Sequence, residues 1–294
     1  RDYTPAQAEQ YLTDVREQLV PLFTGYESVG LASMDMDEVM QLLEGTMNTL
    51  GHEMQTAFGY MQAYELYDAT ASSSKMPGSY ETYLVYISPV GDLSDLLTAA
   101  HEFGHFTDGF VNCNLTDSID VAEVFSQGLE YLTLDAADLG VLKRSALRRN
   151  KMNDSLLTSL SQACYYAFEC RVFALDEIEL TREKINELYY ECNSAYGLTT
   201  PGFETYDSQG WIDIQHFFIA PYYMISYCLS NDLALQIYQL EQETAGAGLK
   251  KYCDMLYTSA GSTLLAFAEA NELRSPFNEG RVAELAEFLE ANLK

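Results

Sequence analysis

The segment "TAAHEFGHFTDGF", from Thr98 to Phe110, contains two of the four histidines of the chain. His101 and His105 stand four residues apart in it, and Glu102 follows directly after the first histidine. In an α-helix, residues i and i+4 lie one above the other on the same face. If the segment is helical, the two imidazoles therefore reach toward one common point, and Glu102 is turned about 100° away around the helix axis.

Two histidines at this spacing, with a glutamate after the first, are typical of a helical zinc site. The pattern predicts that His101 and His105 ligate Zn²⁺ and that Glu102 acts as the catalytic general base, taking a proton from water. A catalytic zinc site uses three protein ligands and keeps one position open. The alternative is that these polar residues only share an exposed helix face, because the short motif also occurs by chance.

Two glutamates in "VAEVFSQGLEYL", residues 121–132, are candidates for further metal chemistry. Glu130 follows His105 by 25 residues, enough for a loop and a returning helix, and is predicted as the third metal ligand. Glu123 lies two helical turns before Glu130 and is predicted to accept a hydrogen bond from a ligating histidine, which fixes its tautomer. Either glutamate is alternatively a solvated carboxylate, since the chain holds 44 acidic residues.

Composition narrows the class of protein. The chain has 294 residues, 48% of them hydrophobic, which indicates a globular fold. Its net charge of −28 opposes binding to nucleic acid and to anionic membranes, and no segment approaches the roughly 20 apolar residues of a membrane helix. Six scattered cysteines without a C-x-x-C pair predict reduced thiols and a cytoplasmic location.

The apolar spacing predicts a mainly α fold with a small β-element before the helix of the paired histidines. Thr4 before Pro5 is typical of a helix start, and Thr181 marks another. The chain is expected to form one domain over 1–294. Helices are expected over 4–19, 37–50, 52–68, 121–134, 212–240 and 278–293, with three or four more over 138–196, a loop over 69–79 and a strand over 80–88.

"HEFGH", followed at this spacing by "SQGLE", resembles the thimet oligopeptidase and oligoendopeptidase F family of zinc peptidases. Three further stretches agree in the family's order: "KMPGSYETYLVYIS" (75–88), "QACYYAFECRVF" (162–173) and "HFFIAPYYMISY" (216–227). The resemblance covers most of the chain. It implies a multi-helix, zincin-type catalytic domain with Zn²⁺ as its cofactor and short peptides as substrates.

The resemblance also implies roles for residues after the metal motif. His216 and one or both of Tyr223 and Tyr227 would stabilise the oxyanion of the tetrahedral intermediate, where preorganised donors have their largest effect. The tyrosines are alternatively core aromatics, since the chain has 22 tyrosines. An edge strand around Tyr83 to Ile87 is expected to hold the substrate extended by backbone pairing.

The chain departs from the family pattern in two places. Asp108 stands where members often carry another histidine, and Val124 with Phe125 replaces the usual Ala-Pro before Ser126. Members of the family usually also have an N-terminal helical lobe. Because the chain starts at Arg1 and not at Met, it is expected to be the catalytic portion, with that lobe as a partner.

The expected function is that of a zinc-dependent endopeptidase that hydrolyses short peptides. Two other classes stay open at this point. One is a zinc-bound, catalytically weak peptide-binding module, and the other is an all-helical scaffold without metal. Peptide turnover with and without a chelator separates the first two, and stoichiometric zinc in the purified protein excludes the third.

Overall fold

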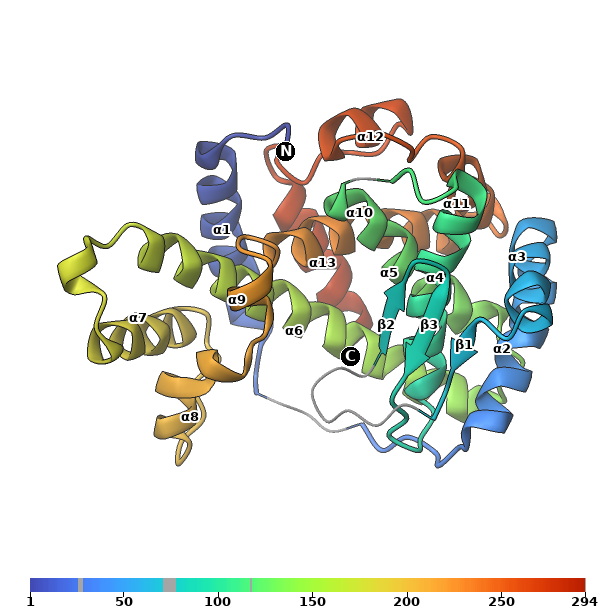
Figure 1. Ribbon diagram of the computed structural model, residues 1–294, viewed down its shortest axis with the longest axis horizontal. Helices are drawn as coiled ribbons and strands as arrows, with labels where there is room; N and C mark the ends of the chain where they lie inside the picture. The colour runs from blue at the N-terminus through green and yellow to red at the C-terminus, as the bar shows by residue number, and fades with distance from the viewer. Residues whose placement is uncertain (26–28, 71–77, 117, 294) are drawn as a thin grey trace. The chain divides into compact units, whose positions relative to one another are not determined.

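The computed structural model describes residues 1–25, 29–70, 78–116 and 118–293. It is built mainly of helices, with one small sheet (Figure 1), so the predicted fold class is confirmed. Two compact units can be distinguished. The first comprises Arg1–Asp2, Ser28–Lys151 and Ser230–Ser275, and the second comprises Tyr3–Glu27, Met152–Leu229 and Pro276–Lys294.

The sheet of the first unit has three strands, β1 (Tyr67–Asp68), β2 (Gly78–Glu81) and β3 (Leu84–Ile87), in the order β1-β3-β2 (Figure 1). The central β3 runs parallel to β1 and antiparallel to β2. The single strand expected over 80–88 is wrong, because Thr82 and Tyr83 form a turn with positive φ angles of 44° and 69°. Hairpin turns of this kind usually carry Gly or Asn, so the sequence held no turn signal here. Of the loop expected over 69–79, residues 71–77 lie outside the described residues.

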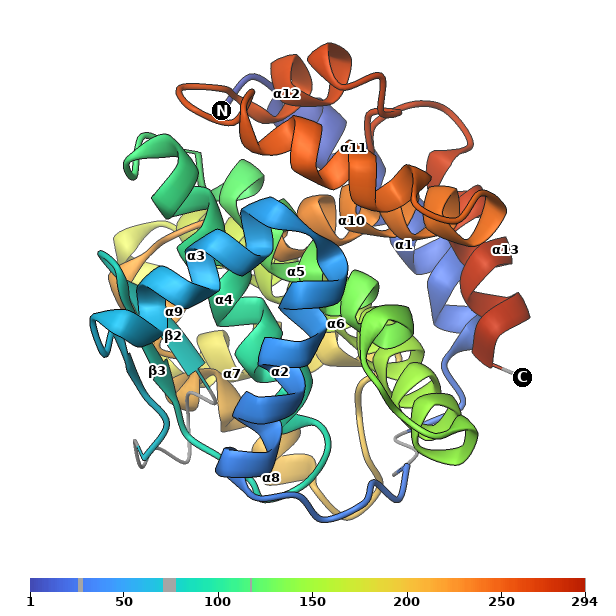
Figure 2. The same ribbon diagram turned by 90° about the vertical axis from the view of Figure 1, so that its right-hand side faces the viewer.

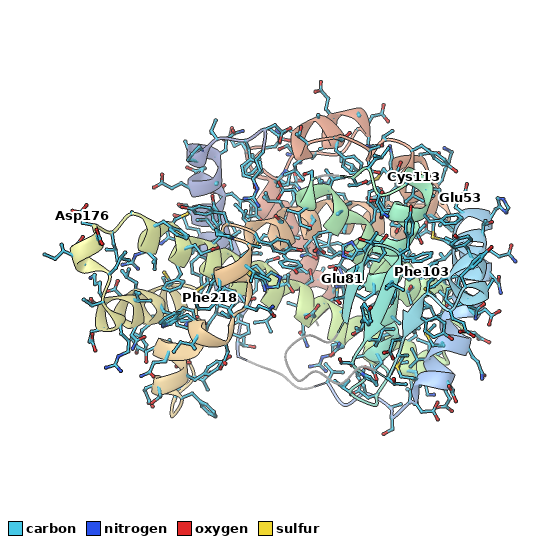
Figure 3. The ribbon with its side chains drawn as sticks, in the orientation of Figure 1. Glu53, Glu81, Phe103, Cys113, Asp176 and Phe218 are labelled. Carbon is cyan, nitrogen blue, oxygen red and sulfur yellow. The ribbon has the colours of Figure 1, made fainter. Side chains whose placement is uncertain are left out.

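Helices α2 (Met36–Leu50) and α3 (His52–Ala63) pack on α4 (Asp95–Asn112), as Figure 2 shows. The predicted break between α2 and α3 falls at Gly51, whose φ of 109° is readily adopted only by glycine. α3 ends five residues before the predicted end at residue 68. Phe103 of α4 (Figure 3) is fully buried and contacts an aromatic ring of α3. This contact anchors the buried side of the helix that carries the paired histidines.

Helix α5 (Ile119–Ala136) follows α4 after a short loop and packs closely along it. The two backbones approach closely at Gly104. A Cβ there would lie 2.5 Å from the carbonyl oxygen of Phe125 and 2.6 Å from the Cα of Ser126. The glycine of the histidine motif is therefore required by packing, and it brings the α5 side chains up to the histidines. α11 (Ala247–Leu256) and α12 (Leu264–Ala270) also contact α5.

The second unit contains shorter helices. α1 (Pro5–Leu19) begins with the predicted cap: Thr4 and Gln7 satisfy each other's backbone N–H groups. The other helices that lie wholly in this unit are α7 (Arg182–Ala195), α8 (Glu204–Gln209), α9 (His216–Ile219) and α13 (Arg281–Leu293). α1 packs on α13, and α7 packs on α8. No helix in the described ranges has the length and hydropathy needed to span a membrane.

Two long helices, α6 (Val141–Phe173) and α10 (Ile225–Glu243), contribute residues to both units. Of the three or four helices predicted over 138–196, the structure has α6, a short 3-10 helix at Glu177–Glu179 and α7, so α6 alone takes up most of the range. Residues 141–173 contain neither Gly nor Pro, so nothing ends α6 before residue 173. The single helix expected over 212–240 is wrong, since Pro221 and the left-handed Tyr222 (φ 63°) separate α9 from α10.

Candidate metal centre

The paired histidines lie on α4, as the sequence predicts, and their side chains are partly accessible. The ring centroids of His101 and His105 are 5.1 Å apart. The exposed fractions of the two side chains are 22% and 13%. A site that must admit water and a substrate needs such an open side.

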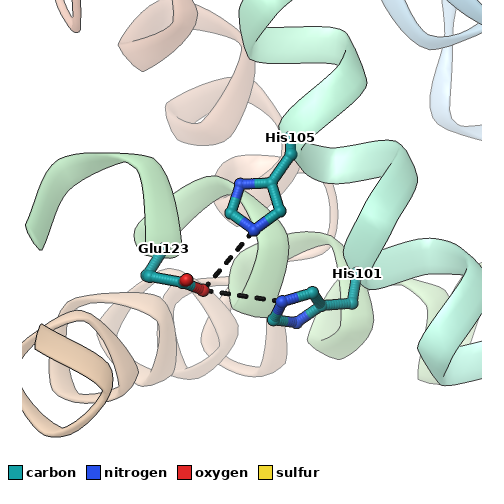
Figure 4. A group of neighbouring side chains, drawn as sticks. All are labelled: His101, His105 and Glu123. Carbon is teal, nitrogen blue, oxygen red and sulfur yellow. Dashed lines mark ion pairs between the residues drawn. The ribbon is translucent and has the colours of Figure 1, made fainter. Parts of the chain in front are cut away.

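Glu123 of α5 faces both histidines (Figure 4). Its Oε2 atom lies 3.5 Å from Nε2 of His101 and 3.6 Å from Nε2 of His105. The side chain is only 2% exposed, and the Ser126 hydroxyl, 2.9 Å away, donates to the same oxygen. Two imidazole nitrogens and one carboxylate oxygen therefore converge, all within 4.8 Å of one another.

These three atoms fit a zinc ion. Zinc takes nitrogen and carboxylate oxygen ligands at about 2.0–2.2 Å in tetrahedral geometry, which places neighbouring ligand atoms roughly 3–3.5 Å apart. The distances of 3.5 and 3.6 Å from Glu123 to the two imidazoles are close to this spacing. Two histidines and one glutamate are also a common ligand set of catalytic zinc.

Glu130 stands on the other side of His101. Its Oε1 accepts a hydrogen bond from Nδ1 of His101 at 2.8 Å, and its Oε2 lies 2.6 Å from Nζ of Lys151. The geometry thus favours exchanging the roles that the sequence predicted for Glu123 and Glu130. Seven residues correspond to about 10 Å along a helix. The spacing places both glutamates on one face, but it does not tell which of them reaches the Nε2 side.

The pKa values of His101 and Glu130 are coupled. Burial favours the neutral form of His101, but the hydrogen bond and charge of Glu130 outweigh it and raise the pKa to about 9. Burial also opposes the charge of Glu130, but Lys151 and His101 outweigh it and lower the pKa of this carboxyl. The ionised Glu130 holds the proton on Nδ1, which leaves Nε2 as the nitrogen for a cation.

Glu102 is 6% exposed and packs against β2. A Cβ at Gly78 would lie 2.6 Å from Oε1 of Glu102, so a larger residue at this position would require the Glu102 side chain to move. Burial raises the pKa of Glu102, and the neighbouring His101 and His105 offset part of this effect. A raised pKa suits a group that takes and returns a proton near neutral pH.

The sequence motifs did not identify two residues of this site, Lys151 beside Glu130 and Tyr80 beside His105. Lys151 gave no signal, because a single lysine in a helix is usually solvated. Tyr80 of β2 stacks on His105, with centroids 6.1 Å apart, and its hydroxyl donates to Asn114 at 2.6 Å. Asp108, which replaces the family's usual histidine, is buried and accepts a hydrogen bond from the Ser259 hydroxyl at 2.7 Å.

The second predicted cluster forms within the second unit. The ring of His216 lies 4.8 Å from that of Tyr223 and 6.2 Å from that of Tyr227, and the two tyrosine rings are 5.0 Å apart. All three side chains are only partly buried, unlike the fully buried tyrosines of the core. The structure therefore brings these three residues together with one another, in a different unit from the metal ligands.

The strand expected to bind substrate must be corrected. The stretch Tyr83–Ile87 is mostly β3, which is the central strand and is paired on both sides. A central strand has no edge for a substrate. The outer strand that borders Glu102 is β2, which begins at Gly78.

Two histidines and a glutamate on one helix, a second helix whose glutamate faces both histidines, and a small sheet beside them are the arrangement of a metallopeptidase. The chain belongs to peptidase family M3, because the model of that family matches residues 89–278. This match confirms the family that the sequence motifs predicted. No curated protein sequence matches the chain significantly.

Solved structures agree with this fold. Pz peptidase A, solved with an inhibitor, superposes with a TM-score of 0.87 at 17% identity, over 100% of this chain and 59% of its own. A protein assigned as oligoendopeptidase F superposes with a TM-score of 0.87 at 19% identity, over 99% of this chain and 58% of its own. A second protein assigned as oligoendopeptidase F, from Bacillus anthracis, superposes with a TM-score of 0.82 at 18% identity, over 100% of this chain and 57% of its own. The chain therefore spans just under three fifths of the length of these relatives.

Proposed function

We propose that this chain is a zinc-dependent endopeptidase that hydrolyses short peptides. The observation that carries the proposal is the position of Glu123, whose Oε2 lies 3.5 and 3.6 Å from the Nε2 atoms of His101 and His105. These three residues hold Zn²⁺. Glu130 binds His101 from the opposite side and orients its ring, instead of serving as a ligand.

Zn²⁺ held by these residues would polarise the peptide carbonyl and would lower the pKa of the attacking water, so that a hydroxide nucleophile becomes available near neutral pH. Glu102 takes the proton of the attacking water and returns it to the departing amine. Its burial and raised pKa support this role, since the carboxyl can then exist in both protonation states during turnover. Gly78 of β2 has no side chain, which leaves space beside the carboxylate of Glu102.

The remaining groups bind and polarise the peptide. His216 with Tyr223 or Tyr227 donates hydrogen bonds to the carbonyl oxygen as negative charge develops on it. Their mutual contacts and partial exposure support this assignment over a core role. The outer edge of β2 pairs with the extended backbone of the substrate, as edge strands do in peptide recognition.

The test uses the metal-loaded chain and its Glu102→Gln variant. We expect the variant to bind zinc like the wild type and to lose about 10²- to 10⁴-fold in kcat, because Glu102 moves a proton but does not ligate. Metal content by mass spectrometry and internal cleavage of a mixed peptide pool are the two readouts. Full turnover by the metal-loaded variant overturns the mechanism.

The wild-type result in the same experiment separates the alternative functions. Zinc without turnover, in the presence of peptide binding, points to a catalytically weak peptide-binding module. Protein without stoichiometric zinc points to a scaffold. Turnover that a chelator removes and zinc restores supports the endopeptidase.

We further propose that an N-terminal helical lobe of the full-length protein completes the substrate channel. The length of the matched relatives supports this, because the chain covers 57–59% of three of them. Supplying such a lobe in cis or in trans should lower KM and raise kcat, since more contacts hold the peptide and less water enters. The cytoplasmic location stays a prediction.

A further inference from the structure

Both oxygens of the Glu130 carboxylate are held by nitrogen donors. His101 donates from Nδ1 to Oε1 at 2.8 Å, and Nζ of Lys151 lies 2.6 Å from Oε2. The side chain of Lys151 is only 3% exposed. A buried ammonium is costly unless it is paired. Lys151 thus holds one oxygen of Glu130 while His101 holds the other, so both oxygens are engaged away from the Nε2 side of His101.

Further contacts keep the ammonium in place. Nζ of Lys151 lies 4.8 Å from the centroid of the Tyr131 ring, within the range of a cation–π interaction. The Tyr131 hydroxyl in turn donates to Oδ1 of Asn231 at 2.8 Å. The lysine therefore sits between a carboxylate and a ring that is itself fixed by a buried hydrogen bond.

Lys151 is one of three cations on the same face of α6, at residues 144, 148 and 151. Arg144 donates to a backbone carbonyl at the end of α5, Arg148 pairs with Asp135, and Lys151 pairs with Glu130. The spacings of four and three residues place them in one row along the helix. Only Lys151 reaches the partner of His101. Arg148, whose side chain is 37% exposed, is therefore a matched control at the same helix–helix contact.

We propose that Lys151 is a positioning residue of the metal centre: it holds Glu130 against Nδ1 of His101 and so leaves Glu123 as the carboxylate that faces both Nε2 atoms. The inference rests on the metal site of the proposed function. It explains why two glutamates on one helix face have different roles: a residue on another helix holds one of them in place. Lys151 touches neither metal nor substrate and acts only through Glu130.

The experiment measures zinc affinity by competition with a chromophoric chelator, on metal-stripped wild type, Lys151→Met, Arg148→Met, Glu130→Gln and the double variant Lys151→Met/Glu130→Gln. Methionine keeps much of the length of the lysine and removes its charge. We expect Lys151→Met to bind zinc about 10- to 100-fold more weakly, because this is the usual effect of changing the groups that orient a metal ligand. Arg148→Met should bind zinc like the wild type.

The double variant tests whether Lys151 acts through Glu130. If it does, adding Lys151→Met to Glu130→Gln should change the zinc affinity little, so the two effects are not additive. Thermal unfolding of the metal-free proteins shows which variants fold. The double variant removes both partners of the Lys151–Glu130 ion pair, so it keeps the comparison with Glu130→Gln available if Lys151→Met alone does not fold.

Three results overturn the inference. Lys151→Met with wild-type zinc affinity and a lower melting temperature makes Lys151 a structural cation only. Additive losses in the double variant show that Lys151 acts apart from Glu130. If the wild type binds no zinc, the proposed metal centre itself is refuted. This outcome differs from the first two because the wild type, and not only the variants, fails to bind zinc.

Discussion

Two glutamates of the same helix have different surroundings, which supports the different roles proposed for them. Glu123 shares one oxygen among the Nε2 atoms of two histidines and a serine hydroxyl. Glu130 has each oxygen bound to a separate cationic or N–H donor. The first arrangement leaves a carboxylate ready to accept a metal ion, and the second uses the carboxylate fully within the protein. Charge and residue type alone do not distinguish them.

Removing each glutamate should therefore affect metal binding unequally. Glu130→Ala is expected to weaken zinc binding about 10- to 100-fold, the usual effect of losing a hydrogen-bond partner of a metal ligand. Glu123→Ala removes a ligand and should weaken zinc by considerably more. Competition titration of both variants, with metal-free melting temperatures as a control for folding, measures this. The reverse order of affinities would restore Glu130 as the third ligand.

Among the helices, the contact between α4 and α5 determines whether the ligands meet. His101 and His105 come from α4 and Glu123 comes from α5, so the distance between these helices sets the distance between the ligands. Gly104 permits this distance, because a Cβ at this position would lie 2.5 Å from a backbone atom of α5. The glycine of the motif thus has a geometric role that is separate from the chemistry of its neighbours.

Gly104→Ala should push the two helices apart. We expect a loss of about 1–3 kcal/mol in the free energy of unfolding, the usual cost of overpacking, together with weaker zinc binding. Gly59→Ala on α3 is the matched control, because nothing lies within 4 Å of a Cβ there. Since alanine favours the helical state over glycine by about 1 kcal/mol, the control should be neutral or stabilising. Denaturant unfolding and zinc titration of both variants decide the question; equal behaviour would refute the packing argument.

The turn between α9 and α10 arranges the second cluster. Glu169 of α6 accepts the backbone N–H of Tyr222 at 2.9 Å, and Tyr222 has a left-handed backbone with a φ of 63°. This hydrogen bond fixes the residue just before Tyr223. A buried carboxylate is thus used to hold a strained turn, which is a common way to support functional side chains.

Tyr223→Phe and Tyr227→Phe should show which hydroxyl acts on the substrate. Phenylalanine keeps the ring and its contacts but removes the donor. The catalytic tyrosine should lose roughly 10²-fold or more in kcat, with little change in melting temperature. Steady-state kinetics on one fluorogenic peptide measures this for each variant. Normal turnover by both would leave His216 as the donor.

For the whole molecule, metal binding is linked to stability. The ligands come from two helices of the first unit, and these residues cannot form the same site in the unfolded chain. A ligand present at 100 times its Kd stabilises the folded state by about 2.7 kcal/mol. For a chain of this size, 1 kcal/mol corresponds to roughly 2–4 °C in Tm.

Chelation should therefore lower the melting temperature by roughly 5–10 °C, combining these two relations. Calorimetry with and without a chelator, followed by addition of zinc, measures the shift and its reversal. Glu123→Ala should melt at the same temperature with and without the chelator, because it lacks a ligand. A chelator shift that persists in this variant would show that the metal binds elsewhere.

Much of this protein follows from local sequence. Helix starts at Thr4 and Thr181 were predictable because capping uses residues three positions apart. The spacing of His101 and His105 predicted their common face because helical geometry is local. Where local signals were missing, as at the turn of Thr82 and Tyr83, the prediction of one strand was wrong.

The sequence by itself determined the helical class and the two histidines with their glutamate, since each depends on neighbours within a turn or two of chain. It also indicated the family, through the order of several short motifs along the chain. Only the tertiary structure favours Glu123 over Glu130 as the proposed third ligand, because this choice depends on how α4 and α5 pack and on Lys151 from a third helix. It likewise showed that β2, and not β3, is the outer strand beside Glu102. These are contacts between residues distant in sequence, and no local pattern encodes the distance between two packed backbones.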